Sequence, residues 1–467
     1  MATKETSKTP AQRLLDILGP VDRWHDFDEI GHMGLPSRAV MEDMLAPAAK
    51  AGPASRLGPL EKIHVFWFAG MSCDGCSVSV TGAQAPSVES LMLGAHPGLP
   101  RMILHHPVLN IEAGPWYVKA QEDAIRGTLD GPYAIVLEGS ISDEVAAMLQ
   151  GGDDKGSGHG YWAAQGEEPW GENGELRHVT ADEWIARLAP GAAASIAIGT
   201  CATWGGIPAA DGNPTGAMSL MDFLGKDYRS AFGVPVVNVP GCPPVGDNFT
   251  ETVAAVLYFL QGFGPLPEFD ELGRPAWLFG ETVHRHCVRG AYYEEGSFAE
   301  TFGDPECLVE IGCWGPVVNC NIASRGMINH IGGCMNSGGA CIGCTMPGFP
   351  DKFTPFYKRP PGSLTSTAAS RLLGSVIRPL RRNTNAHMNR EVRWDLHKDV
   401  PSGWAREKGE PNAVQNTVHR FYDRIRRSTD TSKNRGEVWG KRDEWTEARD
   451  PSTEHRSEAA TTDREGR

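Results

Sequence analysis

The sequence predicts an α/β fold built on a doubly wound parallel sheet. Continuous apolar runs that suit buried strands recur along the first 262 residues, and helix-compatible stretches separate them. This alternation is typical of parallel sheets with helices on both faces. Each run also leads into a loop rich in glycine or proline, and such sheets bind ligands beyond the carboxyl ends of their strands. The expected strands are Lys62–Ala69, 133–137, 194–198 and 235–239.

Helices are expected between and after these strands, at 88–93, 116–129, 181–188 and 218–223. A further apolar helix at 253–260 closes the domain, and a helix of one or two turns is expected at 11–18. Residues 151–174 are rich in glycine and acid, which favours a surface insertion. No apolar run reaches the roughly 18 residues that a membrane-spanning helix needs.

Charge and composition divide the chain into four predicted regions. The net charge is −14, which argues against a nucleic-acid binder, but residues 361–467 carry 21 basic and 16 acidic residues. We therefore expect an N-terminal extension (1–60), the α/β domain (61–262), a cysteine-rich domain (263–360) and a charged C-terminal extension (361–467). A basic amphipathic helix at 371–380 is expected to dock on the protein's own assembly rather than on a membrane.

The cysteines are the most informative residues. All eleven lie between positions 73 and 344, and a long chain with an odd number of thiols suits metal ligation better than a disulfide framework. A first group follows the carboxyl ends of three predicted strands and should converge at one edge of the sheet: Cys73, Cys76, Cys201 and Cys242. Four thiolates are the ligand set of a 4Fe–4S cluster.

Two further groups of metal-binding residues follow in the cysteine-rich region. The second group is His284, Cys287, Cys307 and Cys313, and the third is Cys320, Cys341 and Cys344. Zinc takes the same ligand types. A zinc ribbon prefers two close pairs, however, and neither group shows them. Three groups in one chain indicate an electron relay more than structural zinc.

Several motifs in this order resemble the small, electron-transferring subunit of nickel–iron uptake hydrogenases, from about Lys62 to Lys358. They are Cys73-x-Gly75-Cys76, Glu138-Gly139-Ser140-Ile141, GTCATWGG at 199–206, Pro240-Gly241-Cys242-Pro243-Pro244, His284-x2-Cys287, Cys307-Leu308, Gly312-Cys313-x-Gly315-Pro316 and Cys341-Ile342-Gly343-Cys344. The resemblance implies a flavodoxin-like domain followed by a loop-rich cluster domain. It also implies three iron–sulfur clusters in line, which carry electrons from H2 oxidation at a nickel–iron site in a separate large subunit. No catalytic residue is expected in this chain.

The resemblance also assigns ligands to each cluster. It implies that Cys73, Cys76, Cys201 and Cys242 hold a proximal 4Fe–4S cluster and that His284, Cys287, Cys307 and Cys313 hold a distal 4Fe–4S cluster. Cys320, Cys341 and Cys344 match the medial cluster, which is often 3Fe–4S in the family. His286 is then a neighbour near the surface, and Glu138 is interpreted as a strand-end carboxylate that contacts the partner subunit.

Three positions depart from the common family pattern. Asp74 lies between Cys73 and Cys76, as in the actinobacterial-type, high-affinity hydrogenases, where an aspartate joins three cysteines at the proximal cluster. We expect Asp74 to bind iron in place of one of the flanking cysteines, with a loop-capping role as the alternative. Cys334 is a fourth thiol beside the third group and would make the medial cluster 4Fe–4S. Gly75 and Gly206 stand where oxygen-tolerant membrane-bound relatives have extra cysteines.

Two other functions remain as alternatives: the iron–sulfur subunit of a related quinone oxidoreductase, and a zinc-stapled scaffold protein. The large subunit is the expected partner, in a dimer of heterodimers or a larger assembly. A quinone or a small carrier is the expected electron acceptor. The N-terminus shows no apolar signal core or twin-arginine pair, which favours a cytoplasmic location, with peripheral membrane association as the alternative.

Overall fold

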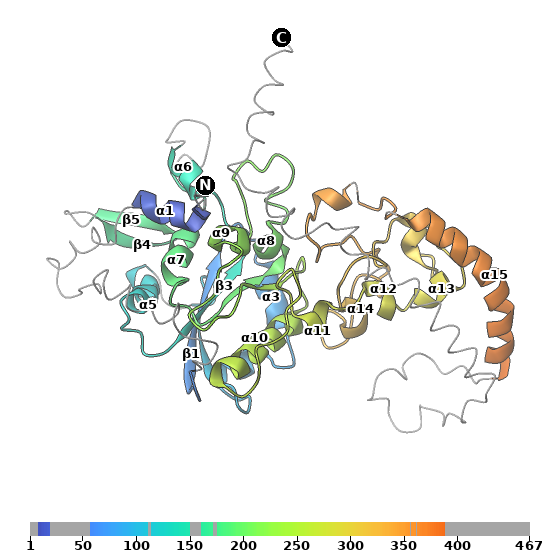
Figure 1. Ribbon diagram of the computed structural model, residues 1–467, viewed down its shortest axis with the longest axis horizontal. Helices are drawn as coiled ribbons and strands as arrows, with labels where there is room; N and C mark the ends of the chain where they lie inside the picture. The colour runs from blue at the N-terminus through green and yellow to red at the C-terminus, as the bar shows by residue number, and fades with distance from the viewer. Residues whose placement is uncertain are drawn as a thin grey trace, which may run out of the picture.

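The computed structural model describes residues 8–18, 57–110, 114–149, 160–170, 175–354, 356–360 and 362–387. These residues form an α/β part around one sheet and a second part of short helices and loops, which lies to its right in Figure 1. One long helix, α15 (Ser363–His387), runs along the outer end of the second part. The predicted α/β fold with a loop-rich domain after it is confirmed.

The sheet has five parallel strands in the order β2-β1-β3-β6-β7. When these five strands are numbered from 1 to 5 in chain order, this is the 2-1-3-4-5 order of flavodoxin-like folds. Their bounds are β1 (Lys62–Ala69), β2 (Arg101–His105), β3 (Tyr133–Glu138), β6 (Ser195–Ile198) and β7 (Val237–Val239). Four of these strands were predicted. The edge strand β2 was not, because only two of its five residues are buried and it begins with an exposed arginine.

Helices cover both faces of the sheet, because alternate side chains of the central strands point to opposite faces. Phe66 and Phe68 pack against α1 (Pro10–Leu18), α5 (Pro115–Ile125), α7 (Ala181–Leu188) and α9 (Leu220–Leu224). Val65 and Trp67 pack against α3 (Gly75–Thr81), α4 (Val88–Leu93) and α10 (Gly246–Gln261). The predicted closing helix is therefore longer than expected and begins seven residues earlier.

Two segments outside the predicted strands also contact this core. Helix α1 buries Leu14 against the sheet domain, although it lies in the expected N-terminal extension. Part of the expected surface insertion forms β4 (Ala164–Trp170), which pairs in an antiparallel hairpin with β5 (Glu175–Thr180), just after the insertion. Glu144 is the first residue of α6 (Glu144–Leu149). Its carboxylate accepts hydrogen bonds from the backbone N–H groups of Trp162 and Ala163, just before β4, and so holds this hairpin in place.

The second part contains short helices joined by long loops. They are α11 (Ala276–Phe279), α12 (Val283–His286), α13 (Gly290–Glu294), η2 (Leu308–Ile311), α14 (Ile322–Arg325) and η3 (Asp351–Phe353). Their core is small and combines aromatic rings such as Trp314, Phe349 and Phe353 with the buried thiols of Cys313 and Cys341. The cysteines are thus part of the packing of this domain.

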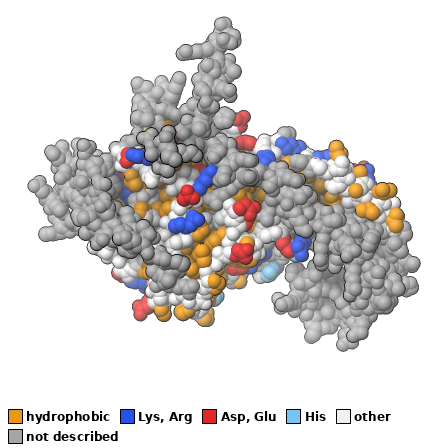
Figure 2. All heavy atoms as spheres, viewed as in Figure 1, with side chains coloured by type: hydrophobic (Ala, Val, Ile, Leu, Met, Phe, Trp, Pro, Cys, Tyr) orange, Lys and Arg blue, Asp and Glu red, His pale blue; other side chains and the backbone are white. Residues whose placement is uncertain are grey.

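Helix α15 contacts α13 and η2 through a face of small residues: Ser363, Thr367, Ser370 and Gly374 are all buried. A Cβ added at Gly374 would lie 2.1 Å from the backbone oxygen of Glu295, so the approach is close. The opposite face exposes Leu364, Leu372, Leu373 and Val376, and Figure 2 shows hydrophobic side chains on this end of the molecule. The helix was predicted, but its apolar face is not the one that docks here. Among the described residues, no helix has the length and hydropathy to cross a membrane.

Candidate metal centres

The first group of thiols lies at the carboxyl edge of the sheet. Cys73 and Cys76 follow β1, Cys201 follows β6 and Cys242 follows β7, as the sequence predicted. Each of the other three thiols acts electrostatically on Cys76. Burial raises the pKa of Cys76 far above its ordinary value, and the nearby carboxylate of Glu138 adds to this shift. Burial likewise raises the pKa of Cys201 to about 11.

Glu138 supports this group from inside the protein. Its side chain is buried, and its Oε1 accepts hydrogen bonds from the backbone of Cys76 at 3.0 Å and of Ser77 at 3.3 Å. Its Oε2 accepts from the Trp67 indole at 3.1 Å and from the Ser77 hydroxyl. The interpretation of Glu138 as a contact to the partner is therefore wrong, because all these donors are internal. The carboxylate holds the loop that carries Cys73 and Cys76.

Two glycines leave space beside the thiols of the first group. A Cβ added at Gly199 would lie 2.3 Å from Cys76 Sγ, and one at Gly206 would lie 2.7 Å from Cys201 Sγ. Both glycines have a positive φ, so a side chain there would be strained as well. Backbone can thus approach a bulky inorganic group closely, which fits an iron–sulfur cluster.

Asp74 is exposed, with a left-handed backbone (φ 59°) at the start of α3. Its side chain makes no capping hydrogen bond to that helix, while its backbone N–H donates to Ser72 Oγ at 3.0 Å. The loop-capping alternative therefore gains no support from the structure. The carboxylate lies beside two cysteines in sequence, and whether it binds iron stays a prediction.

The second group lies near α12, α13 and η2. Cys287 and Cys313 both act electrostatically on Cys307, and burial raises the pKa of Cys313 to about 11. The ring of His284 packs edge-on against Tyr293, whose hydroxyl is in electrostatic contact with Cys307. His286 instead pairs with Glu281 at the surface. The structure thus separates the two histidines as the sequence predicted.

The third group includes Cys334. This thiol acts electrostatically on Cys320, Cys341 and Cys344, so it lies with the three cysteines expected there. Burial raises the pKa of Cys320 to about 12. Sequence reasoning missed Arg274, a fully buried cation in electrostatic contact with Cys320.

Backbone N–H groups point at most of these sulfurs in a repeated pattern. The thiol of residue i accepts a hydrogen bond from the N–H of residue i+2 at five positions, namely Cys287, Cys307, Cys313, Cys320 and Cys341. Cys201 Sγ accepts one from Ile207. Hydrogen bonds of this kind stabilise thiolates and raise the reduction potential of a bound cluster.

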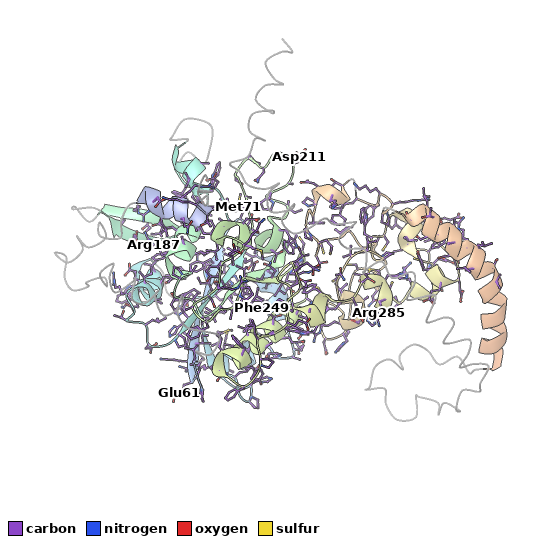
Figure 3. All side chains as sticks on the ribbon, viewed as in Figure 1. Glu61, Met71, Arg187, Asp211, Phe249 and Arg285 are labelled. Carbon is purple, nitrogen blue, oxygen red and sulfur yellow. The ribbon has the colours of Figure 1, made fainter. Side chains whose placement is uncertain are left out.

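Single hydrogen bonds also join the groups to one another. The hydroxyl of Thr200, next to Cys201 in the first group, donates to the backbone oxygen of Cys344 in the third. The N–H of Cys341, in the third group, donates to Cys313 Sγ in the second at 3.3 Å. The third group therefore lies between the other two. In Figure 3, Met71 marks the end of the path near the first group and Arg285 the end near the second.

The donor set fits iron–sulfur clusters. Buried thiols that raise one another's pKa cannot all ionise without a cation, and bound iron supplies that charge while thiol protons are released. Within the described part of the chain, no three His, Cys, Asp or Glu side chains converge closely enough to hold a single metal ion.

Comparisons with known proteins agree with this chemistry. Residues 279–357 match the C-terminal domain of NiFe/NiFeSe hydrogenase small subunits, and residues 73–256 match the 20 kDa subunit of NADH ubiquinone oxidoreductase. The periplasmic [NiFeSe] hydrogenase small subunit of Desulfomicrobium baculatum is 36% identical over 64% of this chain and 87% of its own length. The Hydrogenase-2 small chain of Escherichia coli K12 is 30% identical over 71% of this chain and 84% of its own length.

Among solved structures, the actinobacterial-type NiFe-hydrogenase of Ralstonia eutropha H16 is 48% identical, with a TM-score of 0.65, over 74% of this chain and 96% of that one. The cluster domain and these relatives separate the chain from the quinone oxidoreductase alternative. Small subunits of this family carry iron–sulfur clusters, pair with a large subunit that holds the catalytic site, and transfer electrons. This chain therefore belongs to the small, electron-transferring subunits of nickel–iron hydrogenases and is similar in sequence and structure to an actinobacterial-type enzyme.

Proposed function

We propose that the chain holds three iron–sulfur clusters and passes electrons from the proximal through the medial to the distal one. The first group (Cys73, Cys76, Cys201, Cys242) holds the proximal 4Fe–4S cluster. The second (His284, Cys287, Cys307, Cys313) holds the distal 4Fe–4S cluster, and the third holds the medial cluster. The observation that carries this assignment is a pair of hydrogen bonds, from the Thr200 hydroxyl beside Cys201 to the carbonyl of Cys344 and from the N–H of Cys341 to Cys313 Sγ, which orders the groups in a line.

We further propose that Cys334 completes a 4Fe–4S medial cluster with Cys320, Cys341 and Cys344. Its electrostatic contact with all three thiols supports this. A cluster with four thiolate ligands keeps four irons, whereas three thiolates suit a 3Fe–4S cluster. We also propose that Asp74 binds an iron of the proximal cluster in place of one of the flanking cysteines, because its carboxylate is exposed next to Cys73 and forms no helix cap.

The surface around the proximal group is the proposed docking face for the large subunit. Cys73 and Cys242 are exposed here, so the cluster would be open to solvent in the isolated chain. Apolar side chains surround them: Val78 is 69% exposed and Ile207 is 53% exposed. Exposed apolar side chains around a site of this kind mark a protein interface. Arginine at both 78 and 207 should abolish co-purification with the large subunit.

The remaining proposals concern the far end of the chain. Electrons leave at the distal group, near exposed Arg285, His286 and Val288, toward a quinone or a small carrier. The exposed apolar face of α15 is available to a second heterodimer, which supports a dimer of heterodimers or a larger assembly. A cytoplasmic location stays a prediction that cell fractionation tests.

Metal analysis of the chain co-purified anaerobically with its large subunit tests the cluster assignment. Three 4Fe–4S clusters predict about twelve cluster irons per chain, with matching acid-labile sulfide. Cys334→Ser should lose about one iron and give the EPR signal of an oxidised 3Fe–4S cluster. A colourless protein that contains zinc would contradict the proposal.

Asp74→Asn tests the proposed carboxylate ligand. It should change the EPR spectrum of the reduced proximal cluster and leave the medial and distal signals as they are. Asp211→Asn, at an exposed aspartate outside the three groups, is the matched control. Unchanged proximal spectra in Asp74→Asn would mean that Asp74 does not bind iron.

A further inference from the structure

We propose that Thr200 is a positioning residue that holds the proximal and medial ligand loops in the contact through which an electron passes between them. The inference rests on the proposed assignment of the first and third groups to these two clusters. Thr200 is not itself a ligand. It precedes Cys201 in the loop after β6, and its side chain is 1% exposed.

The hydroxyl of Thr200 joins three ligand loops that come from both parts of the molecule. It donates to the backbone oxygen of Cys344 and accepts a hydrogen bond from the N–H of Gly241 at 3.1 Å. The N–H of Thr200 donates in turn to the oxygen of Gly241 at 2.9 Å. A proximal loop at 200–201, a second at 241–242 and the medial loop at 344 therefore meet at one residue.

This arrangement orients the peptide unit between Gly241 and Cys242. The C=O and N–H of a planar trans peptide point in opposite directions. Because the N–H of Thr200 donates to the oxygen of Gly241 on one side, the N–H of Cys242 points to the other side. The thiols of Cys242 and Cys344 interact electrostatically. The hydroxyl of Thr200 also binds the carbonyl of Cys344, so one residue fixes the positions of both the Gly241–Cys242 peptide and Cys344.

A second residue of α8 (Gly199–Trp204) strengthens this contact. The indole of Trp204 donates to the backbone oxygen of Thr345 at 3.3 Å, one residue beyond Cys344. Thr345 Oγ1 donates to the backbone oxygen of Asn319, next to Cys320. Helix α8 thus makes two hydrogen bonds to the loop at 344–345, and Thr345 connects this loop to the backbone beside Cys320.

The residue acts on a simple one-electron step. The reduced proximal cluster loses one electron, the oxidised medial cluster gains it, and no bond forms or breaks. The chain contributes a fixed distance and a path of hydrogen bonds from Gly241, next to Cys242, through the Thr200 hydroxyl to the carbonyl of Cys344. Losing the hydroxyl would leave the N–H of Gly241 and the C=O of Cys344 without this buried partner and would loosen the path.

Thr200→Val tests the inference in the complete heterodimer, because valine keeps the shape of threonine without the hydroxyl. After rapid mixing with H2, EPR should show that the medial cluster is reduced at least about tenfold more slowly, since small losses of alignment have large effects on rate. Exchange between H2 and D2O at the nickel–iron site needs no electron to leave it and should stay unchanged. Thr200→Ser keeps the hydroxyl and should transfer electrons at the native rate.

The control is Thr252→Val in α10, a fully buried threonine whose hydroxyl binds its own helix at Asn248. It should not change the transfer rate. Native transfer in Thr200→Val, or an equal loss in Thr200→Ser, would overturn the inference. If Thr200→Val loses iron, Trp204→Phe decides: slower medial reduction with iron retained supports the inference, and a native rate overturns it. Fewer than three clusters in the unmodified protein would instead reject the proposed function.

Discussion

The two parts of this chain hold their metal-binding residues in different ways. In the α/β part, the proximal cysteines lie in loops beyond a sheet whose core is formed by residues such as Phe66, Phe68 and Trp67. In the cluster domain, Cys313 and Cys341 belong to the core itself, beside a few aromatic rings. The first part can fold by burying apolar surface alone, whereas the second needs metal to complete its interior.

Iron removal should produce the largest difference in stability between the two parts. Anaerobic chelation should abolish hydrogen-exchange protection across 283–353, because buried thiols that lose their iron leave a core too small to stay folded. Strands β1, β3 and β6 should keep their protection. Mass spectrometry of exchanged peptides measures both regions in one sample, and equal loss in the two parts would contradict the difference drawn between them.

Arg274→Met should show how strongly the cluster domain depends on buried charge. Arg274 is fully buried and its Nε donates to Asp270 Oδ2 at 2.8 Å. Removing it leaves the buried carboxylate of Asp270 without its cation and should lower the free energy of unfolding by roughly 3–5 kcal/mol. Arg285→Met is the matched control, because Arg285 pairs with Glu281 four residues away but is half exposed. The control should cost less than about 1 kcal/mol. Denaturant unfolding of the two holoproteins gives the difference.

The pH dependence of stability should identify a weak point of the α/β part. Burial, and then the neighbouring His64, lower the pKa of His105 to about 4 from an ordinary value of 6.5. The unfolded state therefore binds more protons between these values, and stability that is present above pH 6.5 is lost as the pH falls toward 4. The full loss is about 3 kcal/mol.

Unfolding measured from pH 7 to pH 5 checks this expectation. The native protein should lose stability over this range, and His105→Gln should show a flatter dependence. His178→Gln, at an exposed histidine of the same domain, should follow the native curve. Parallel curves for native protein and His105→Gln would show that His105 does not titrate as described.

Gly206→Ala should separate local cluster binding from global stability. A side chain there meets Cys201 Sγ and requires a left-handed backbone, so proximal iron should be lost while the other clusters remain. Gly212→Ala has the same positive φ and open space around it, and should cost only about 1–2 kcal/mol. Iron counts and EPR distinguish the two variants. Full iron content in Gly206→Ala would show that the loop moves aside.

Much of this structure could be predicted because its signals are local. Strand β1 and helices α4 and α7 begin and end where hydrophobic patterning placed them. The first group converges as expected, since the carboxyl ends of parallel strands meet at one edge. Strand β2 and the β4–β5 hairpin were missed, because neither forms a continuous apolar run and both depend on neighbouring elements for their burial.

The sequence by itself determined which residues form each thiol group and in what order they occur, because ligand spacing and strand ends are properties of short segments. Only the tertiary structure decided how the groups meet. Thr200 and Cys344 are 144 residues apart, and no local pattern encodes their contact. The inward role of Glu138 and the docking of α15 through its small polar face were decided in the same way. Such contacts depend on how whole elements pack, which the composition of one segment does not specify.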